Sequence, residues 1–350
     1  MSRRIIATCL TLPVLAALSG TSTSLHAARP EAPQAQGGWR LTLDNDILTG
    51  QATDRDYTGG IGLTFSGDAA RDNPVSLDAL RDGLTGGLHS LFSDDVPSRR
   101  YHSQQVGMML FTPEDITSTT PVYDDRPYAS MLFVSNSAVD IDLLRDSMFI
   151  SRLTIGLLGL GLAADIQRIL HDVTDSDVPN GWEHQVSAGG EPALMVELAR
   201  QDALYLGDNH EWKAGWDAVI GSITEFDASI SWRAGRLHSP WWSHVPSQVR
   251  YVEQSMPVIR AAATEWFVHA GARLRLVAYN ALLQGQFRDS EVTISSRDVE
   301  RLVAEYWGGV AFAFAGHYRI DGYFRGNTPE FKGSNSRSAS WAGISFSYAW

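Results

Sequence analysis

The sequence predicts an all-β protein: a transmembrane antiparallel β-barrel of about twelve strands, with a short helix in an extracellular loop. The first observation is the end of the chain, where apolar residues alternate with small or polar ones from Ala342 to Trp350. This period of two describes a strand with one apolar face, and an aromatic last strand is typical of an outer-membrane barrel. The second is that the longest apolar run, residues 153–164, is shorter than the roughly 20 residues that a membrane-spanning helix requires.

Composition agrees with a barrel, the other structure that can cross a bilayer. The chain has 31 glycines and 10% aromatic residues, and only 19% of its residues are charged. Its net charge of −12 argues against nucleic acid as a partner. We therefore expect a multi-pass protein of the cell outer membrane, in contact with outer-membrane lipids and monomeric. A soluble β-sandwich or a periplasmic jelly roll is the alternative.

The first 27 residues have the pattern of a signal peptide. Arg3 and Arg4 precede an apolar stretch, residues 5–18, and a small residue, Ala27, offers a cleavage site. We expect residues 28–350 to form a single barrel domain. The one cysteine, Cys9, lies within the leader. A mature chain without thiols would have no disulfides, no cysteine-ligated zinc and no thiol catalysis.

Twelve segments alternate at strand length, an even number as expected for a single-chain bacterial barrel. The predicted strands are residues 38–47, 56–66, 102–112, 127–140, 148–162, 185–200, 212–223, 226–237, 264–277, 303–318, 319–327 and 338–350.

If both termini are periplasmic, the loops that follow odd-numbered strands are extracellular. Residues 48–55, 113–126 and 163–184 belong to that set. The insertion at 67–101 would be periplasmic, and it is longer than such turns usually are. Small residues at inward positions such as Ser345 predict a filled barrel rather than an open pore.

Polar residues gather at the first extracellular hairpin. Residues 44–46 read Asp-Asn-Asp, and residues 54–58, on the partner strand, read Asp-Arg-Asp-Tyr-Thr. Antiparallel pairing brings the two clusters side by side. Carboxylate and amide oxygens suit a hard cation such as calcium. The alternative is that Asp and Asn are simply common in hairpin loops.

Two further rim segments carry groups that could take part in chemistry. Arg126 lies among acids, so it could form a structural ion pair or bind a phosphate. Residues 164–171 have the period of a short amphipathic helix, which places Gln167 and His171 one turn apart on one face. A histidine that leans over a cation site is a candidate general base.

Familiar catalytic motifs are missing from the sequence. It contains no Gly-x-Ser-x-Gly, no His-Glu-x-x-His, no P-loop and no Cys pair. The chemistry that remains is hydrolysis by water, which a histidine activates and a bound cation assists.

In these motifs the sequence resembles the outer-membrane lipid A 3'-O-deacylases, calcium-dependent barrels that remove the 3'-acyloxyacyl group of lipid A. The resemblance spans most of the chain after the leader, and the order and spacing of the motifs make it specific. The matching residues are 45–46, 56–58, 105–107, 112–113, 125–129, 167–168 with 171, 179 with 181–182 and 185, 191–192 and 280–285.

The resemblance implies a role for each matching site residue. His171 would be the general base that activates water. Asp46 would help to bind calcium, which polarises the ester carbonyl and offsets the oxyanion charge. Asn45, Thr58 and Gln167 would orient water, substrate or the base.

A second possible calcium ligand is Asp177, which stands roughly where some members carry a glutamate. A lysine that some members use after strand 3 is missing, because residues 115–120 read Asp-Ile-Thr-Ser-Thr-Thr. Arg126 is a possible replacement.

Strand parity offers an independent expectation about this site. Strict alternation places Asp46 on the lumen side with Thr42, and Asn45 on the lipid side with Leu43, unless a bulge intervenes. A site between the barrel wall and an overhanging helix, reached from the outer leaflet, could use both. The alternatives are an outer-membrane phospholipase or other acyl esterase, and a non-enzymatic porin-like barrel.

Overall fold

The computed structural model describes residues 37–50, 55–92, 99–165, 167–168 and 178–350. They form a closed barrel in which each strand pairs antiparallel with its neighbours in sequence and β1 closes onto β12. The predicted signal peptide lies outside the described residues and stays a prediction. The strands are β1 (Gly37–Asn45), β2 (Asp56–Gly67), β3 (Arg99–Thr112), β4 (Ala129–Asp142), β5 (Ser147–Leu158), β6 (Glu191–Leu206), β7 (His210–Gly221), β8 (Ile223–Arg236), β9 (Glu265–Asn280), β10 (Leu302–Phe314), β11 (Tyr318–Asn327) and β12 (Ala339–Ala349).

The predicted fold class is confirmed, with twelve strands in the described part of the chain. Short helices accompany them: α1 (Asp68–Arg71), α2 (Asp78–Phe92), α4 (Ala281–Gln284) and the 3-10 turns η1 (Ile47–Thr49), η2 (Trp182–His184), η3 (Trp241–Ser243) and η4 (Pro246–Gln248). Residues 162–165 and 167–168 are also helical, and they overlap residues 164–171, where a helix was predicted. No helix among the described residues is both long and apolar enough to cross a membrane.

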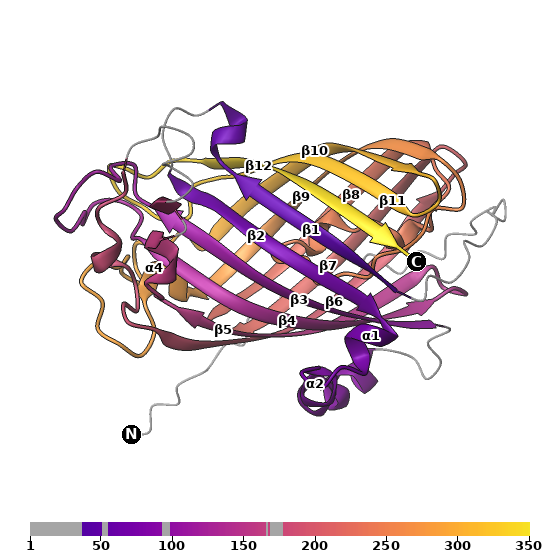
Figure 1. Ribbon diagram of the computed structural model, residues 1–350, viewed down its shortest axis with the longest axis horizontal. Coiled ribbons are helices and arrows are strands. Elements are labelled where there is room, and N and C mark those ends of the chain that lie inside the picture. Colours follow the sequence, from indigo (N-terminus) through magenta and orange to yellow (C-terminus); the bar gives the residue numbers. More distant parts are fainter. Residues whose placement is uncertain (1–36, 51–54, 93–98, 166, 169–177) are drawn as a thin grey trace, which may run out of the picture.

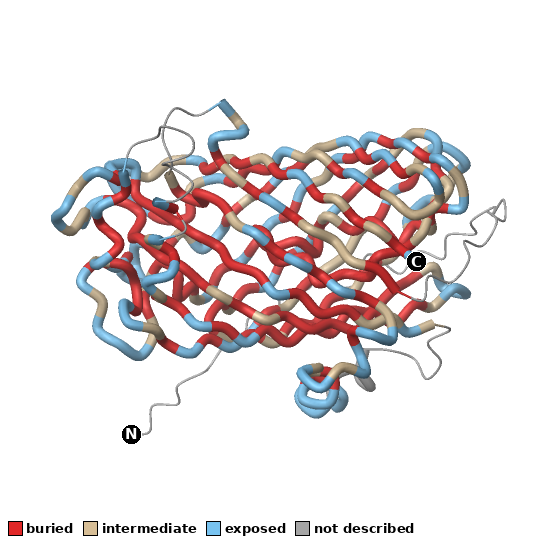
Figure 2. The backbone as a smooth tube through the Cα atoms, viewed as in Figure 1, coloured by how far each residue is buried: buried red, intermediate tan, exposed pale blue. Residues whose placement is uncertain are grey.

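The two ends of the barrel differ. Loops after odd-numbered strands gather at one end, here called the upper rim, on the left in Figure 1. The start of β1 and the end of β12 lie at the opposite end, the lower rim, where the Trp350 amide donates to the Gly37 carbonyl at 3.0 Å. Burial alternates along many strands of the wall (Figure 2), because one face points into the barrel and the other outward.

Several strand bounds were predicted wrongly: β5 ends at Leu158 rather than at residue 162, β6 ends at Leu206 rather than at residue 200, and β10 ends at Phe314 rather than at residue 318. The return strand after the third upper loop begins at Glu191 rather than at residue 185. The intervening residues are held in a loop conformation: Gly189 and Gly190 have positive φ angles, and the Ser130 hydroxyl donates to the Gln185 side chain at 2.9 Å. Period-two alternation alone does not reveal such a tether.

In the described part of the chain, one segment fills the lumen. Residues 237–264, here called the plug, leave β8 at the lower rim and return to β9 at the same end. The Ser103 hydroxyl donates to the Ser255 carbonyl at 2.9 Å, and the Gln105 amide donates to the Val252 carbonyl at 3.0 Å. Further up, the Tyr251 hydroxyl donates to Glu330 in an upper-rim loop at 2.9 Å. The plug thus reaches from one rim to the other, as a filled barrel requires.

Ion pairs fix the plug to the wall. Arg250 of the plug contacts Glu197 on β6 and Glu225 on β8, each at 2.9 Å, and all three side chains are buried. Close packing adds to this: a Cβ at Gly60 of β2 would lie 2.8 Å from Val252. A barrel wall of small residues therefore lets the plug approach the strands closely.

Candidate active site

The predicted site residues Asn45, Asp46 and Thr58 lie together at the upper end of the first hairpin. Asn45 is the last residue of β1, and its side chain accepts a hydrogen bond from the Ile47 amide at 2.8 Å. Asp46 precedes η1 and has no solvent exposure. Its carboxylate accepts from the Arg55 amide at 2.7 Å, and its own amide donates to the Thr58 carbonyl at 3.3 Å.

A β-bulge turns Thr58 to the outside of the wall. The register of β2 on β3 shifts between Tyr57 and Gly59, which leaves Thr58 without a partner residue. Tyr57 points into the lumen, where its hydroxyl donates to Asp44 at 3.1 Å. The Thr58 hydroxyl lies 2.7 Å from the Thr112 hydroxyl of β3. A bulge near residue 46 was named as a complication, and one exists beside it, in the neighbouring strand β2 rather than in β1.

Asn45 lies on the same outer face. It pairs with Gly59, and a Cβ on that glycine would lie 3.3 Å from the Asn45 amide nitrogen. Strict alternation thus predicts Asn45 correctly as outward-facing. For Asp46 the parity argument does not apply, because β1 ends one residue earlier and the chain turns into η1.

The third upper loop covers this outer face. Ala163 and Trp182 pack with Met108 and Leu110 of β3 and with Tyr128 in one buried cluster. Met108 and Leu110 alternate with the lumen-facing Met109 and Phe111, so the cluster lies outside the barrel. The outward-facing Thr112 continues the row of Met108 and Leu110. The helical residues 162–165 and 167–168 and the Thr58–Thr112 pair therefore share one stretch of outer wall.

Gln167 is buried beneath this cover. Its exposed fraction is 1%, and its side-chain oxygen accepts from the indole nitrogen of Trp182 at 2.7 Å. Gly181 allows that arrangement, because a Cβ there would lie 2.5 Å from the Tyr128 ring. The two remaining predicted site residues, His171 and Asp177, fall outside the described residues, so their predicted roles stay predictions.

Arg126 does not lie at this site. Its guanidinium is buried, pairs with Glu330 at 2.5 Å and stacks 4.4 Å above the Phe111 ring on the lumen side of the wall. The ion-pair interpretation is correct, and the phosphate-clamp and lysine-replacement interpretations are not supported. Burial by itself would raise the pKa of Glu330. The positive charges of Arg126 and Arg275 oppose this, and the pKa of the carboxyl lies below its usual range.

Sequence reasoning missed Arg337, which joins two predicted rim clusters. Its guanidinium donates to Asp56 and to Asp125, each at 2.8 Å. Arg55 similarly pairs with Glu114 at 2.8 Å. Three upper loops thus meet at one rim, as strand parity predicted. The sequence gives no indication of which acidic residues a loop arginine will contact.

The motif at 280–285 is structural. Asn280 begins α4, where its side chain accepts from the Leu282 amide at 3.0 Å, and Gln284 accepts from the Asn280 amide at 3.0 Å. These reciprocal bonds cap the short helix. Gly285 then ends it with a φ of 71°.

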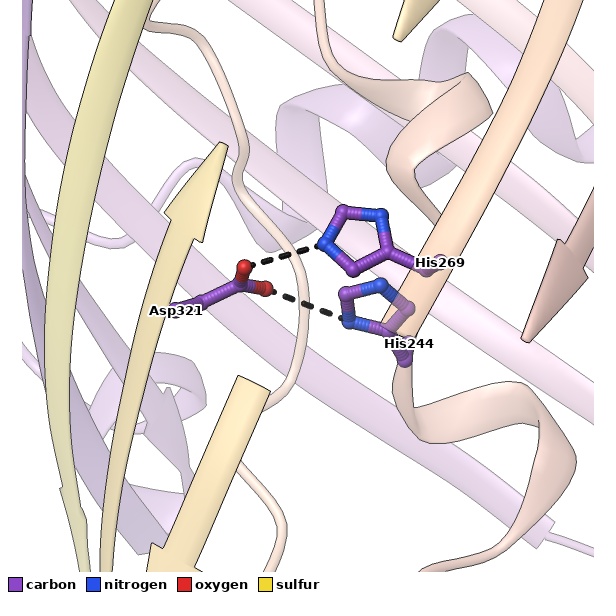
Figure 3. A group of neighbouring side chains, drawn as sticks. All are labelled: His244, His269 and Asp321. Carbon is purple, nitrogen blue, oxygen red and sulfur yellow. Dashed lines mark hydrogen bonds and ion pairs between the residues drawn. The ribbon is translucent and has the colours of Figure 1, made fainter. Parts of the chain in front are cut away.

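A separate cluster of His244, His269 and Asp321 lies in the lumen between plug and wall (Figure 3). Imidazole nitrogens lie 3.5 and 3.1 Å from the carboxylate oxygens. Among the described residues, it is the one such group whose donor atoms converge as in a metal site. The cavity beside it, of about 50 Å³, is also lined by three arginines, Arg40, Arg319 and Arg325, and by no other carboxylate. This charge disfavours a divalent cation, so we interpret the cluster as a tie between plug and wall.

Comparison with family models identifies the chain. The model of outer membrane protein LpxR matches residues 6–350. The chain belongs to this family. The resemblance to the outer-membrane lipid A 3'-O-deacylases is thereby confirmed, and with it the location in the outer membrane.

Comparison with solved structures agrees on the fold. LpxR from Salmonella typhimurium is 16% identical, with a TM-score of 0.68 over 89% of this chain and 100% of that chain. The β domain of a Bordetella autotransporter is 9% identical over 90% and 100%, with a TM-score of 0.41. An outer membrane channel of Pseudomonas putida F1 is 8% identical over 93% and 99%, with a TM-score of 0.44. A comparison with curated proteins gives no match.

Proposed function

We propose that this LpxR-family protein hydrolyses the 3'-acyloxyacyl ester of lipid A in the outer leaflet, with calcium as cofactor. The observation that carries the proposal is the placement of Asn45 and Thr58 on the outer face of the wall, beside the buried Asp46 and close to an overhanging loop. A lipid substrate approaches from this side, whereas a lumenal substrate would meet the plug. Ile47 and Leu48, 40% and 61% exposed, extend the apolar surface beside Asp46.

The donor set of the site fits calcium. The residues brought together offer a carboxylate, an amide and two hydroxyls, all hard oxygen donors. Asp46 would hold the ion, with Asp177 as a second carboxylate. Calcium, when bound, supplies positive charge that polarises the ester carbonyl and stabilises the oxyanion.

The chain's own residues would perform the proton transfers. His171 would take a proton from water as the water oxygen attacks the carbonyl carbon of the ester. The bond between that carbon and the sugar oxygen then breaks, and His171 returns the proton to the sugar oxygen. The products are the 3'-hydroxyl of the sugar and the free acyloxyacyl acid. Gln167, Asn45 and Thr58 would orient the base, the water and the substrate.

Mass spectrometry of lipid A from cells that express the protein tests this proposal. Wild-type protein should remove one acyloxyacyl unit, and His171→Ala or a calcium chelator should abolish the loss. His210→Ala, at the first residue of β7 on the lower rim, is the matched control and should leave the loss unchanged. Lipid A that stays intact in cells containing folded wild-type protein would refute the proposed deacylation of lipid A. Release of lysophospholipid in those cells would favour the phospholipase alternative.

Asp46→Asn separates calcium binding from folding. The amide can still accept from the Arg55 backbone, but the charge is gone. We expect activity that recovers only at raised calcium concentration. An unchanged calcium requirement would exclude Asp46 as a ligand.

The monomeric state remains a prediction, which light scattering of the purified protein can test.

A further inference from the structure

Helix α2, in the periplasmic insertion between β2 and β3, buries its polar face and exposes its apolar face. Residues 78–87 bury three side chains, and all three are polar: Asp78, Arg81 and Thr85. Seven residues of this stretch are exposed, and Asp82 is the only charged one. The others are Ala79, Leu80, Gly83, Leu84, Gly86 and Gly87. A helix on the surface of a water-soluble domain shows the opposite arrangement, with apolar residues inside.

The helix lies against the outer wall of the barrel and not beyond its end. Figure 1 shows it beside the flank of the barrel, and its residues contact β4, β5 and β6. The wall residues it touches face outward. Ser103, Gln105 and Ser137 bind the plug in the lumen, so their neighbours His102, Gln104 and Asn136 point to the outside.

These outward residues form a polar patch on an otherwise apolar belt. His102 and Asn136 lie in neighbouring outward rows of β3 and β4, and Gln104 pairs directly with Asn136. Elsewhere the outer face carries exposed apolar residues such as Phe65, Ile155 and Leu274. Asn136 is six residues from the lower end of β4, which places it well within the height of the wall. Bare amides and an imidazole would be costly there against hydrocarbon.

The polar face of α2 satisfies this patch. Asp78 accepts from the His102 ring nitrogen at 2.8 Å, and Arg81 donates to the Asn136 side chain. Asp82 accepts from Arg100 of β3 at 2.7 Å. As a result Asn136 and Arg81 have no exposure to solvent. The helix and the wall hide one another's polar groups.

We propose that α2 lies in the periplasmic leaflet of the outer membrane, with Leu80 and Leu84 in contact with phospholipid acyl chains. The apolar face of the helix, 49% and 46% exposed at these leucines, continues the lipid-facing belt over the polar patch of β3 and β4. Helix α1 precedes it at the lower end of β2, where the exposed Asp68 and Arg71 meet water and headgroups. The long insertion thus completes the lipid-facing surface.

Fluorescence quenching in proteoliposomes of phosphatidylethanolamine and phosphatidylglycerol tests this proposal. Single cysteines at Leu84, at Asp68 and at Ile155 are placed in a Cys9→Ser background and labelled with an environment-sensitive dye. Ile155 is an exposed residue of β5 and serves as the lipid-facing reference. Lipids with brominated acyl chains should quench position 84 as they quench position 155, and aqueous iodide should quench position 68 alone.

Two results would overturn the proposal. Iodide quenching at position 84 without quenching by brominated chains would place the helix in water. Accessibility to iodide in proteoliposomes, combined with protection from iodide in native outer-membrane vesicles, would assign the leucine face to a protein partner instead. Heat-modifiable migration on gels checks that each labelled variant is folded, and Leu80 provides a second position if the Leu84 variant is not.

Discussion

The hydroxyls of Thr58 and Thr112 lie 2.7 Å apart on the outer face of the barrel, where the bulge in β2 meets the end of β3. Both side chains are buried, with 3% and 0% exposure. Thr112 thus holds Thr58 in one orientation beside Asn45 and Asp46. Thr112 is one of the residues that match the family, and the resemblance implies no role for it. This contact makes it a positioning residue for the proposed site.

Removal of the Thr112 hydroxyl should therefore lower the rate of deacylation. Thr112→Val keeps the shape of the side chain but leaves the Thr58 hydroxyl without this partner, at a cost of about 1 kcal/mol, or roughly a five- to ten-fold lower rate. Thr112→Ser should retain most of the activity. Equal rates for Val and Ser, measured by lipid A mass spectrometry, would show that the hydroxyl does not position Thr58.

Gly181→Ala should displace the loop that covers the site. The added methyl would lie 2.5 Å from the Tyr128 ring, and relief of such overpacking typically costs about 1–3 kcal/mol. We expect a loss of activity with little change in the barrel's heat-modifiable migration. Gly161→Ala is the matched control, since its Cβ would meet nothing within 4 Å. A similar loss in both variants would indicate a general effect on the loop backbone.

Arg250→Ala should destabilise the barrel. The variant leaves Glu197 and Glu225 with less compensating charge in a buried site, a change that typically costs about 3–5 kcal/mol. Urea unfolding in detergent measures the loss, and bilayer conductance shows whether a loosened plug lets ions through. Arg236→Ala, at the exposed lower end of β8, should leave the unfolding midpoint within error. A stable, non-conducting Arg250→Ala protein would contradict a role for the ion pairs in holding the plug.

Acid should weaken the contact between the plug and the upper rim. Burial alone would raise the pKa of Glu330, but the charges of Arg126 and Arg275 hold it below its ordinary value. A lowered pKa in the folded state means that the contribution to stability is complete above the unfolded-state pKa of roughly 4.3 and is lost as the pH falls through the folded-state value. The urea midpoint of wild type should therefore drop faster with acid than that of Glu330→Gln. Parallel curves for the two proteins would show that another group controls acid unfolding.

Much of the architecture followed from local pattern. Period-two alternation predicted the twelve strands, because side-chain direction along a strand depends only on the backbone. The antiparallel succession of those strands then placed the loops after odd-numbered strands at one rim. The alternation itself correctly placed Asn45 outside. The motifs also indicated the family, whose model matches residues 6–350.

Contacts between distant segments were beyond the reach of the sequence. The sequence left open whether Arg126 forms an ion pair or binds a phosphate. Its partner, Glu330, is 204 residues away in the chain. Thr58 faces outward only because β2 bulges against β3. The chemistry of residues 237–264 gave no sign that they fill the lumen.

Helix α2 shows the same limit most clearly. Its leucines and charges could be read from the sequence, but which face is buried depends on the polar patch of β3 and β4 beneath it. The sequence by itself determined the barrel, its family and the residue types at the rim, because these follow from local periodicity and motif order. Tertiary structure alone decided where a bulge overrides strand parity, which segment fills the lumen and which charges are neutralised, because those outcomes depend on partners far away in the chain.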